Sequence, residues 1–143
     1  MFRAFVVIVA ALTIVIGGVL LVAATKPDTF QVKRSLAIKA PPDKIYPLIA
    51  DFKAWPKWSP YETKDPDMKR TYGPVASGKG ATYAWDGDNN VGAGSMEIVD
   101  AGAPALVTLK LDFTRPFEAH NVADFTLEPK DGGTQVSLSL IHI

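Results

Sequence analysis

The sequence predicts an α+β fold, in which a curved antiparallel sheet carries two short helices and follows one N-terminal transmembrane helix. Three observations predict this arrangement. An unbroken apolar run covers Ala4–Thr25, a helical spacing of apolar residues follows in Ala40–Tyr61, and short stretches of alternating apolar and polar residues fill most of the remainder. Alternating stretches separated by turn residues are typical of antiparallel strands with one buried face.

The composition limits the possible classes of protein. The chain has 143 residues, of which 48% are apolar, and this suffices for one domain with a real core. Its 15 lysines and arginines balance 15 aspartates and glutamates. This neutral balance argues against nucleic-acid binding, which normally needs a basic excess. The absence of cysteine excludes disulfides, thiolate nucleophiles and cysteine-ligated zinc.

The apolar run Ala4–Thr25 lies between Arg3 and Lys26 and contains no charge. A helix needs roughly 20 apolar residues to cross the hydrocarbon core of a bilayer, and this run is long enough. A cleaved signal peptide is the alternative, because Val22-Ala23-Ala24 has the small residues of a cleavage site. Signal-peptide cores are shorter, at about 7–15 residues. We therefore expect residues 1–25 to be an uncleaved anchor in the cell membrane.

The side of the membrane stays open. The basic residues after the span predict a cytoplasmic domain by the positive-inside rule, whereas the short N-terminus with its single Arg3 is typical of an anchor that exports the domain. Residues 26–29 form only a short tether. The domain in residues 30–143 is therefore expected close to the bilayer, where a lipid-like ligand has little distance to travel.

The segment Ala40–Tyr61 predicts two short helices at an angle to each other. Pro41 and Pro42 open the first one, where the missing N–H of proline costs little. One apolar face follows at the i, i+3, i+4, i+7 spacing, formed by Ile45, Leu48, Ile49 and Phe52. Trp55 and Trp58 lie in the second helix, and we expect both indoles to press against the sheet. Glu62–Asp67 then reads as a polar loop.

Seven segments are expected to form strands: Phe30–Ile38, Met68–Tyr72, Ala81–Trp85, Gly94–Asp100, Ala105–Thr114, Phe117–Glu128 and Thr134–Leu140. Asp86–Asn90 is rich in residues that tolerate a left-handed backbone, which predicts a hairpin tip. In the first strand, Arg34 falls on the apolar face by strict alternation. Either a bulge intervenes there or the arginine points inward.

Several short motifs occur in an order and spacing that resemble a known superfamily: Arg34-Ser35 with Ile38, Ala40-Pro41-Pro42, Phe52 with Trp55–Pro60, Gly73-Pro74, Gly78, Gly80, Tyr83–Asp86, Gly94–Ile98, Pro116–Glu118 and Gly132–Thr134. The resemblance is to the START-like (SRPBCC) helix-grip proteins, also described as polyketide cyclase/dehydrase and lipid transport, and it covers roughly Phe30 to Leu138. It implies a curved sheet that wraps around one long C-terminal helix, with a cavity between them.

The sequence departs from that superfamily after its last strand. The C-terminal helix is missing, because the chain stops at Ile143. We therefore expect residues 30–143 to be an incomplete domain, encoded by a truncated gene fragment. Its concave face would be a large exposed apolar patch, which soluble monomers rarely carry.

Catalytic and metal sites find little support in the sequence. No serine lies in a nucleophile elbow, and no histidine pair has zinc spacing. His120 shares the outward side of its strand with Glu118 and Asp124. That cluster reads as a metal site, an acid–base dyad or a solvated polar face, and the solvated face is favoured. We therefore predict no catalytic residues, no metal and no cofactor.

Ligand binding finds more support, because the small domain carries many large amphipathic rings. Ligand cavities are mostly apolar, with a few polar groups that fix orientation. A polar group aimed at a core costs about 1–3 kcal/mol if it stays unpaired, and a ligand can be its partner. The candidate ligand-binding residues are Trp55, Trp58, Tyr83, Trp85, Glu97, Phe113, Arg115 and Asn121, and Arg34 is a further candidate polar group. The alternatives are that the two tryptophans only seal the core and that Arg115 ends in solvent.

The resemblance implies non-covalent binding of a hydrophobic or amphipathic, lipid-like small molecule at a membrane surface. A polyketide cyclase or dehydratase-type enzyme is a second reading, with Glu97, Arg115 and Asn121 as its polar groups. A non-catalytic interaction module, whose partner supplies the missing helix, is a third. Members of the superfamily show all three behaviours, so the fold alone does not choose among them.

Overall fold

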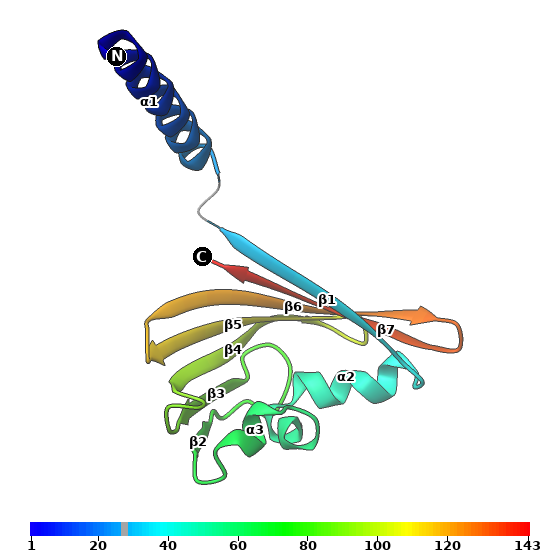
Figure 1. The fold of residues 1–143 in the computed structure, drawn as a ribbon. Coiled ribbons are helices and arrows are strands. Elements are labelled where there is room, and N and C mark those ends of the chain that lie inside the picture. The colour runs from blue at the N-terminus through cyan, green and yellow to red at the C-terminus, as the bar shows by residue number, and fades with distance from the viewer. Residues whose placement is uncertain (27–28) are drawn as a thin grey trace.

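The computed structural model describes residues 1–26 and 29–143, apart from the side chain of Phe2. Its elements, in chain order, are α1 (Phe2–Ala24), β1 (Phe30–Ile38), α2 (Pro42–Ala50), the 3₁₀ helix η1 (Phe52–Lys57), α3 (Tyr61–Lys64), β2 (Lys69–Tyr72), β3 (Thr82–Asp86), β4 (Ala93–Gly102), β5 (Leu106–Arg115), β6 (Ala119–Lys130) and β7 (Gly133–His142) (Figure 1). Pro27 and Asp28 of the predicted tether lie outside the described residues.

All seven strands form one antiparallel sheet in the order β1-β7-β6-β5-β4-β3-β2. The first strand therefore pairs with the last, and Phe30 lies opposite His142. Helices α2 and α3 lie together with η1 on one side of the sheet (Figure 1). This is the predicted α+β fold, and each observed strand agrees with its predicted segment to within about two residues. Among the described residues, no element follows β7.

The predicted helical segment divides differently from the expectation. Pro42 is the first residue of α2, and Ile45 and Ile49 are buried as predicted. Asp51 then leaves the helical conformation, and its side chain accepts a hydrogen bond of 2.9 Å from the Lys53 amide. This capping contact starts η1. Phe52 therefore belongs to η1 and does not continue the first helix.

A second correction concerns the stretch after η1. It was expected to be a polar loop, but Tyr61–Lys64 forms α3, and Glu62 is buried there. A single helical turn has too few residues to show periodicity in the sequence. The side-chain partners of Glu62, Arg70 and Tyr83, come from β2 and β3, so they are distant from α3 in the sequence.

The core lies between α2, η1 and the middle of the sheet. It is formed by apolar side chains on the rows of the sheet that face the helices, hereafter the inner face, and by the buried sides of the helices: Ile45, Ile49, Ala50, Phe52, Met68, Ala81, Tyr83, Met96, Ile98, Val107, Leu109, Ala123, Phe125 and Leu127. Burial of an apolar side chain of this size contributes about 1.5–3 kcal/mol.

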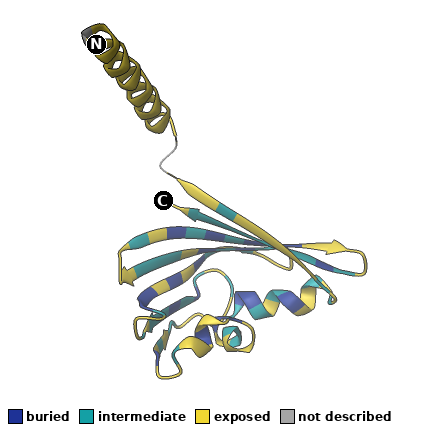
Figure 2. Cartoon of the chain, in the orientation of Figure 1, coloured by how far each residue is buried: buried dark blue, intermediate teal, exposed yellow. Residues whose placement is uncertain are grey.

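The helices cover only part of the inner face. On β7, the inner-face residues Val136, Leu138 and Leu140 stay half-buried, and on β1 Leu36 is 66% exposed. Figure 2 shows β1 exposed along most of its length, whereas buried residues gather in α2 and the middle strands. Among the described residues, the inner face of β1 and β7 is therefore covered less than the middle of the sheet.

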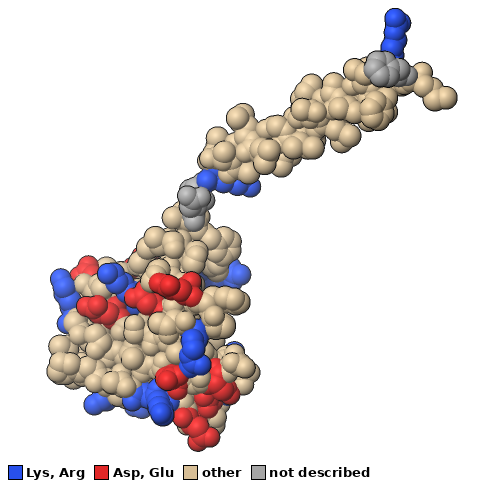
Figure 3. Space-filling model, turned by 90° about the vertical axis from the view of Figure 1, so that its left-hand side faces the viewer, with Lys and Arg blue, Asp and Glu red and all other residues tan. Residues whose placement is uncertain are grey.

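Helix α1 has every described side chain exposed. Its segment Arg3–Ala24 has a mean hydropathy of 3.1 and is long enough to cross a membrane. In Figure 3 the middle of this helix carries no charge, whereas the globular part carries charges of both signs. Length and composition of this kind fit an anchor and a signal sequence alike.

Candidate ligand-binding face

Aromatic rings from the helices and from the inner face of the sheet form one continuous cluster. Phe52 is its centre, with ring centroids 5.4 Å from Trp55 and 5.8 Å from Tyr83. Contacts of this type add about 0.5–1.5 kcal/mol each beyond their buried area. The cluster continues through six further ring pairs: Trp55–Trp58, Trp55–Phe125, Trp58–Phe125, Tyr72–Tyr83, Tyr83–Trp85 and Trp85–Phe113.

Trp55 and Trp58 are both fixed by the end of α2. The indole N–H of Trp55 donates to the carbonyl of Ile49 at 3.0 Å, and that of Trp58 donates to the carbonyl of Leu48 at 2.7 Å. These bonds satisfy carbonyl groups that the last turn of a helix leaves unpaired. The two rings differ in exposure, because Trp55 is half-buried in the core whereas Trp58 stays 39% exposed.

Trp58 stands at the boundary between the covered and uncovered parts of the inner face. Its ring lies 6.3 Å from the ring of Phe125, in an edge-to-face arrangement. Phe125 pairs across the sheet with Leu138 of β7, which is only half-buried. Trp58 therefore presents a fixed, partly exposed ring beside an open apolar floor.

Trp85 and Phe113 line the inner face nearer the other edge of the sheet. The indole N–H of Trp85 donates to the Val91 carbonyl at 3.0 Å, and its ring meets Phe113 edge-on at 5.5 Å. Gly94 makes room for this ring, because a Cβ at that position would lie 2.7 Å from Cη2 of Trp85. Both aromatic residues are half-buried and belong to the predicted set.

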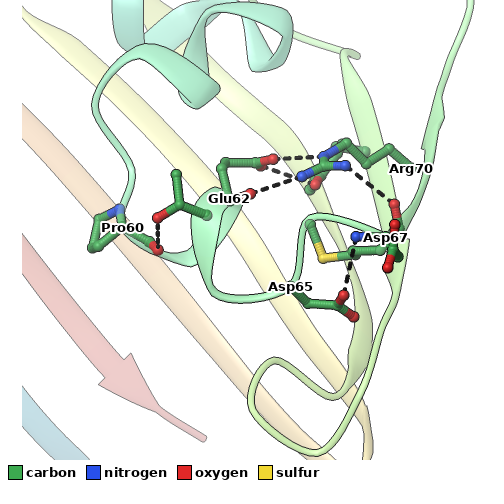
Figure 4. A network of polar contacts seen from close by, with 8 residues as sticks. Pro60, Glu62, Asp65, Asp67 and Arg70 are labelled. Carbon is green, nitrogen blue, oxygen red and sulfur yellow. Dashed lines mark hydrogen bonds and ion pairs between the residues drawn. The ribbon is translucent and has the colours of Figure 1, made fainter.

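Tyr83, another predicted binding residue, is buried in a polar network with Glu62. Its hydroxyl donates to Oε1 of Glu62 at 2.9 Å, and Nε of Arg70 donates to Oε2 at 2.7 Å. Arg70 also donates to the carbonyls of Glu62 and Met68. Figure 4 shows Arg70 turned toward Glu62 from the neighbouring strand. Glu62 was not among the predicted site residues, although Arg70 shares the inward side of its strand with Tyr72, and an inward arginine needs a carboxylate partner.

This network perturbs the ionisation of its members. Burial, reinforced by the hydrogen bond to Glu62, raises the pKa of Tyr83 well above its ordinary value. The hydrogen bond to Glu62 also raises the pKa of Arg70. Tyr83 therefore stays neutral and Arg70 charged at any physiological pH. The network holds α3 against β2 and β3 and leaves Tyr83 no polar group free for a ligand.

Glu97 and Arg115 do not face the aromatic cluster. Glu97 pairs with Thr82 and Lys110 on the outer face of the sheet, where it is exposed. It lines an outer-face hollow of about 210 Å³ together with Thr71 and Ser95. Strict alternation predicts this side for Glu97, because its neighbours Met96 and Ile98 are the buried ones.

Arg115 was expected to continue the inward parity of β5, and this expectation is wrong. The register of β4 and β5 shifts between Ala93 and Gly94, so Thr114 is an extra residue and Arg115 pairs with Ala93. A bulge of this kind re-aims the side chain that follows it. The guanidinium forms an ion pair with Asp86, beside the hairpin tip.

Asn121 does face inward, at the end of the sheet nearer the N-terminus of β1. It is 8% exposed and pairs with Leu111 on β5 and with His142 on β7. Its Oδ1 lies 3.0 Å from Nδ1 of His142. Of Glu97, Arg115 and Asn121, only Asn121 therefore lies on the same face as Phe113. His142 is a partner that was not predicted, because the predicted last strand ended at Leu140.

His120 lies on the outer face, as its parity predicts. Its Nδ1 is 2.8 Å from Asp112 and its Nε2 is 3.3 Å from Glu118, whereas Asp124 instead accepts a bond from Thr108. The hydrogen bond with Asp112, and then that with Glu118, raises the pKa of His120. The side chains of His120, Asp112 and Glu118 are solvent-exposed and lie on the opposite side of the sheet from the aromatic cluster, which fits a solvated polar face.

Several solved structures have the same fold as this chain but a low sequence identity to it. A crystal structure of Ara h 8.0201 is 14% identical, covers 80% of this chain and 76% of that chain, and has a TM-score of 0.59. MLL2253 from Mesorhizobium loti is 17% identical, covers 78% of this chain and 75% of that chain, and has a TM-score of 0.59. An uncharacterised protein from Rhizobium leguminosarum is 12% identical, covers 80% of this chain and 78% of that chain, and has a TM-score of 0.61. At such identities the likeness establishes the fold alone.

No curated protein sequence is similar enough to count as a relative. The sequence does match a family described as polyketide cyclase/dehydrase and lipid transport, over residues 29–141. That range contains all seven strands except the last residue of β7, and it contains the whole aromatic cluster. The chain therefore belongs to this SRPBCC family, whose members typically bind hydrophobic ligands.

Proposed function

We propose that this chain binds a lipid-like, hydrophobic or amphipathic small molecule on the uncovered inner face of its sheet, and that α1 anchors it in the cell membrane. The observation that carries the proposal is the position of Trp58. Its ring is fixed by the Leu48 carbonyl, packs edge-on against Phe125 and stays 39% exposed. A rigid half-exposed indole beside an apolar floor offers contact area at little entropic cost.

The floor beside Trp58 supports an apolar ligand. Leu138 and Leu140 on β7, together with Val32 on β1, are half-buried and face the same side. Each Å² of apolar surface removed from water contributes roughly 25 cal/mol. A molecule that covers these side chains therefore gains its affinity mainly from burial, and Asn121 and His142 at one end of the floor can orient a polar group.

The placement of the polar candidates favours binding over catalysis. Acid–base chemistry needs its groups within hydrogen-bond reach of one substrate atom. Glu97 and Arg115 face the opposite side of the sheet from Asn121, so these three residues do not form one catalytic group. We propose a binding protein for this reason and leave a cyclase-type reaction as an outcome for experiment.

Two features of α1 support the membrane anchor. Its span Arg3–Ala24 is long and apolar, and it makes no buried contact with the sheet domain. Its one internal hydroxyl before the last turn, on Thr13, donates to the carbonyl of Val9 at 2.8 Å, so this group needs no water partner in a bilayer. N-terminal sequencing of the protein from membranes tests the anchor, because a signal sequence would be missing from the mature chain.

Native mass spectrometry of the full chain, extracted from its own membranes in a non-ionic detergent, tests the binding function. We expect a stoichiometric co-purifying mass in the lipid range, and we expect Trp58→Ala to lose most of it. Tyr61→Ala is the matched control, since Tyr61 is 62% exposed and its cation–π partner is Lys64, not the sheet. An empty protein, or equal loss in both variants, would contradict the proposal. Conversion of the bound mass during incubation would indicate an enzyme.

A further inference from the structure

Arg34 is placed on the inner face by the register of β1 and β7. That register runs from Phe30 to Ile38 without a shift, so no bulge turns Arg34 outward. Arg34 lies opposite Leu138, which pairs with Phe125, which in turn pairs with Val107 of the core. Residues that pair directly across antiparallel strands point to the same side. Arg34 therefore occupies the same cross-strand row as the aromatic floor beneath Trp58.

Arg34 differs from the other two arginines of the sheet in having no carboxylate partner among the described residues. Arg70 pairs with Glu62, and Arg115 pairs with Asp86. The side chain of Arg34 makes one hydrogen bond, of 3.0 Å, to the carbonyl of its neighbour Lys33. Most of its guanidinium donors thus stay available, and the side chain is exposed.

The surroundings of Arg34 on the inner face are apolar. Val32 and Leu36 flank it on the same strand, Leu138 lies opposite, and Leu140 is diagonal to it. Among the described residues, it is the only lysine or arginine on the inner rows of β1 and β7. If an apolar molecule alone covered Arg34, the guanidinium would lose its hydration without gaining a partner, and this costs free energy.

Arg34 and Trp58 bracket a strip of the inner face. Neighbouring strands are about 4.8 Å apart, so the backbone of Arg34 lies roughly 10 Å from that of Phe125, over which Trp58 stands. Half-buried Leu138 forms the floor between them. The strip therefore has an aromatic wall on one side, an apolar floor and a guanidinium on the other side.

We propose that Arg34 binds the carboxylate of the ligand, which makes the ligand class a long-chain carboxylic acid. This inference rests on the proposed function, since it assigns the head group of the same ligand. The alkyl chain lies along Leu138 and Leu140 beside Trp58, and the carboxylate accepts a bidentate pair of hydrogen bonds from the guanidinium. A carboxylate matches the charge of one arginine, whereas a phosphate monoester carries about −1.5 to −2, which Arg34 alone does not neutralise.

The test compares hexadecanoic acid with hexadecan-1-ol, which has the same chain and no charge. Both are titrated into the delipidated full chain in non-ionic detergent and followed by native mass spectrometry. We expect the wild type to bind the acid about tenfold or more tightly than the alcohol. Arg34→Gln should bring the acid down to the affinity of the alcohol, and Arg34→Lys should keep an intermediate preference. Lys33→Gln is the matched control, because Lys33 is adjacent in sequence but faces the outer side.

Each outcome decides a different claim. If Arg34→Gln keeps the preference for the acid, the role of Arg34 is wrong while binding of the alcohol still supports the proposed function. If hexadecyl phosphate binds more tightly than the acid and depends on Arg34, the carboxylate assignment is wrong. If folded protein, checked by circular dichroism, binds neither compound in any form, both the inference and the proposed function fail.

Discussion

The hydroxyl of Tyr83 lies 2.9 Å from Oε1 of Glu62, although 21 positions separate the two residues in the chain. The second carboxylate oxygen, Oε2, receives Nε of Arg70 at 2.7 Å. Glu62 therefore satisfies two buried or half-buried donors at once, and it joins the short helix α3 to β2 and β3. This carboxylate holds the edge of the sheet that α2 does not reach.

Glu62→Ala should destabilise the protein by about 3–5 kcal/mol, because it leaves Arg70 and Tyr83 without their partner. Tyr83→Phe should cost only about 0.5–1.5 kcal/mol, since Glu62 keeps its bond to Arg70. Urea unfolding of the full chain in detergent, followed by tryptophan fluorescence, measures both values. Equal costs for the two substitutions would contradict the central position of Glu62.

Gly94→Ala should destabilise the protein and displace the ring of Trp85. A Cβ at position 94 would meet the Asp112 carbonyl oxygen and Cη2 of Trp85, at 2.7 Å from the latter. Overpacking of this kind costs about 1–3 kcal/mol. Gly102→Ala is the matched control on the same strand, because its Cβ would have its nearest neighbour at 3.9 Å. Thermal unfolding and the near-ultraviolet circular dichroism of Trp85 measure the difference, and similar losses in both variants would disprove the steric reason.

The pKa of His120 should lie above 6.5, the ordinary value, and Asp112→Asn should lower it. A raised pKa in the folded state means that the protonated ring favours folding. Its contribution to stability is therefore fully present below pH 6.5 and disappears as the pH rises through the pKa of the folded state. A histidine NMR titration checks the shift. Asp124→Asn is the control on the same face, and an equal effect there would contradict a specific bond to Asp112.

Thr134→Val should cost about 1–3 kcal/mol, because the Thr134 hydroxyl is buried and donates to the Ala40 carbonyl at 2.6 Å. This bond holds the corner between β1 and α2 against β7. Ser137→Ala is the control, because it also removes a hydroxyl of β7. The Ser137 hydroxyl forms a 2.8 Å hydrogen bond with that of Ser35 on β1, and this bond is exposed to solvent. We expect that control to change the free energy of unfolding by less than 0.5 kcal/mol. Comparable costs would show that burial does not set the effect.

The sequence predicted the strands and the first helix because period-2 and period-3.6 patterns are local. It also placed Phe113 and Asn121 on the inner side correctly, since parity within one strand suffices for that. Glu97 was predicted to bind the ligand, although it alternates with the buried Met96 and Ile98 and therefore lies on the outer face. Arg115 was misplaced for a different reason, because a one-residue register shift in β4 and β5 leaves no mark in the sequence of β5 alone.

The partners of the polar residues could not be predicted at all. Glu62 finds Tyr83 and Asn121 finds His142 only after the strands have assembled, across 21 positions in each case. For Arg34 the sequence allowed two alternatives, a bulge in the strand or a side chain on the inner face. The register between β1 and β7 has no shift and therefore excludes the bulge, but a register between the first and last strands cannot be read from one segment of sequence.

The pairing of β1 with β7 also determines when this protein folds during its synthesis. Ala40 and Thr134 are 94 positions apart, so β1 has no partner until almost the entire chain has left the ribosome. Loop closure over such a distance is slow, and an unpaired strand is prone to aggregate while it waits. The strand that is made first in the sheet is therefore the last to find its neighbour, and the sheet closes only when β7 has been made.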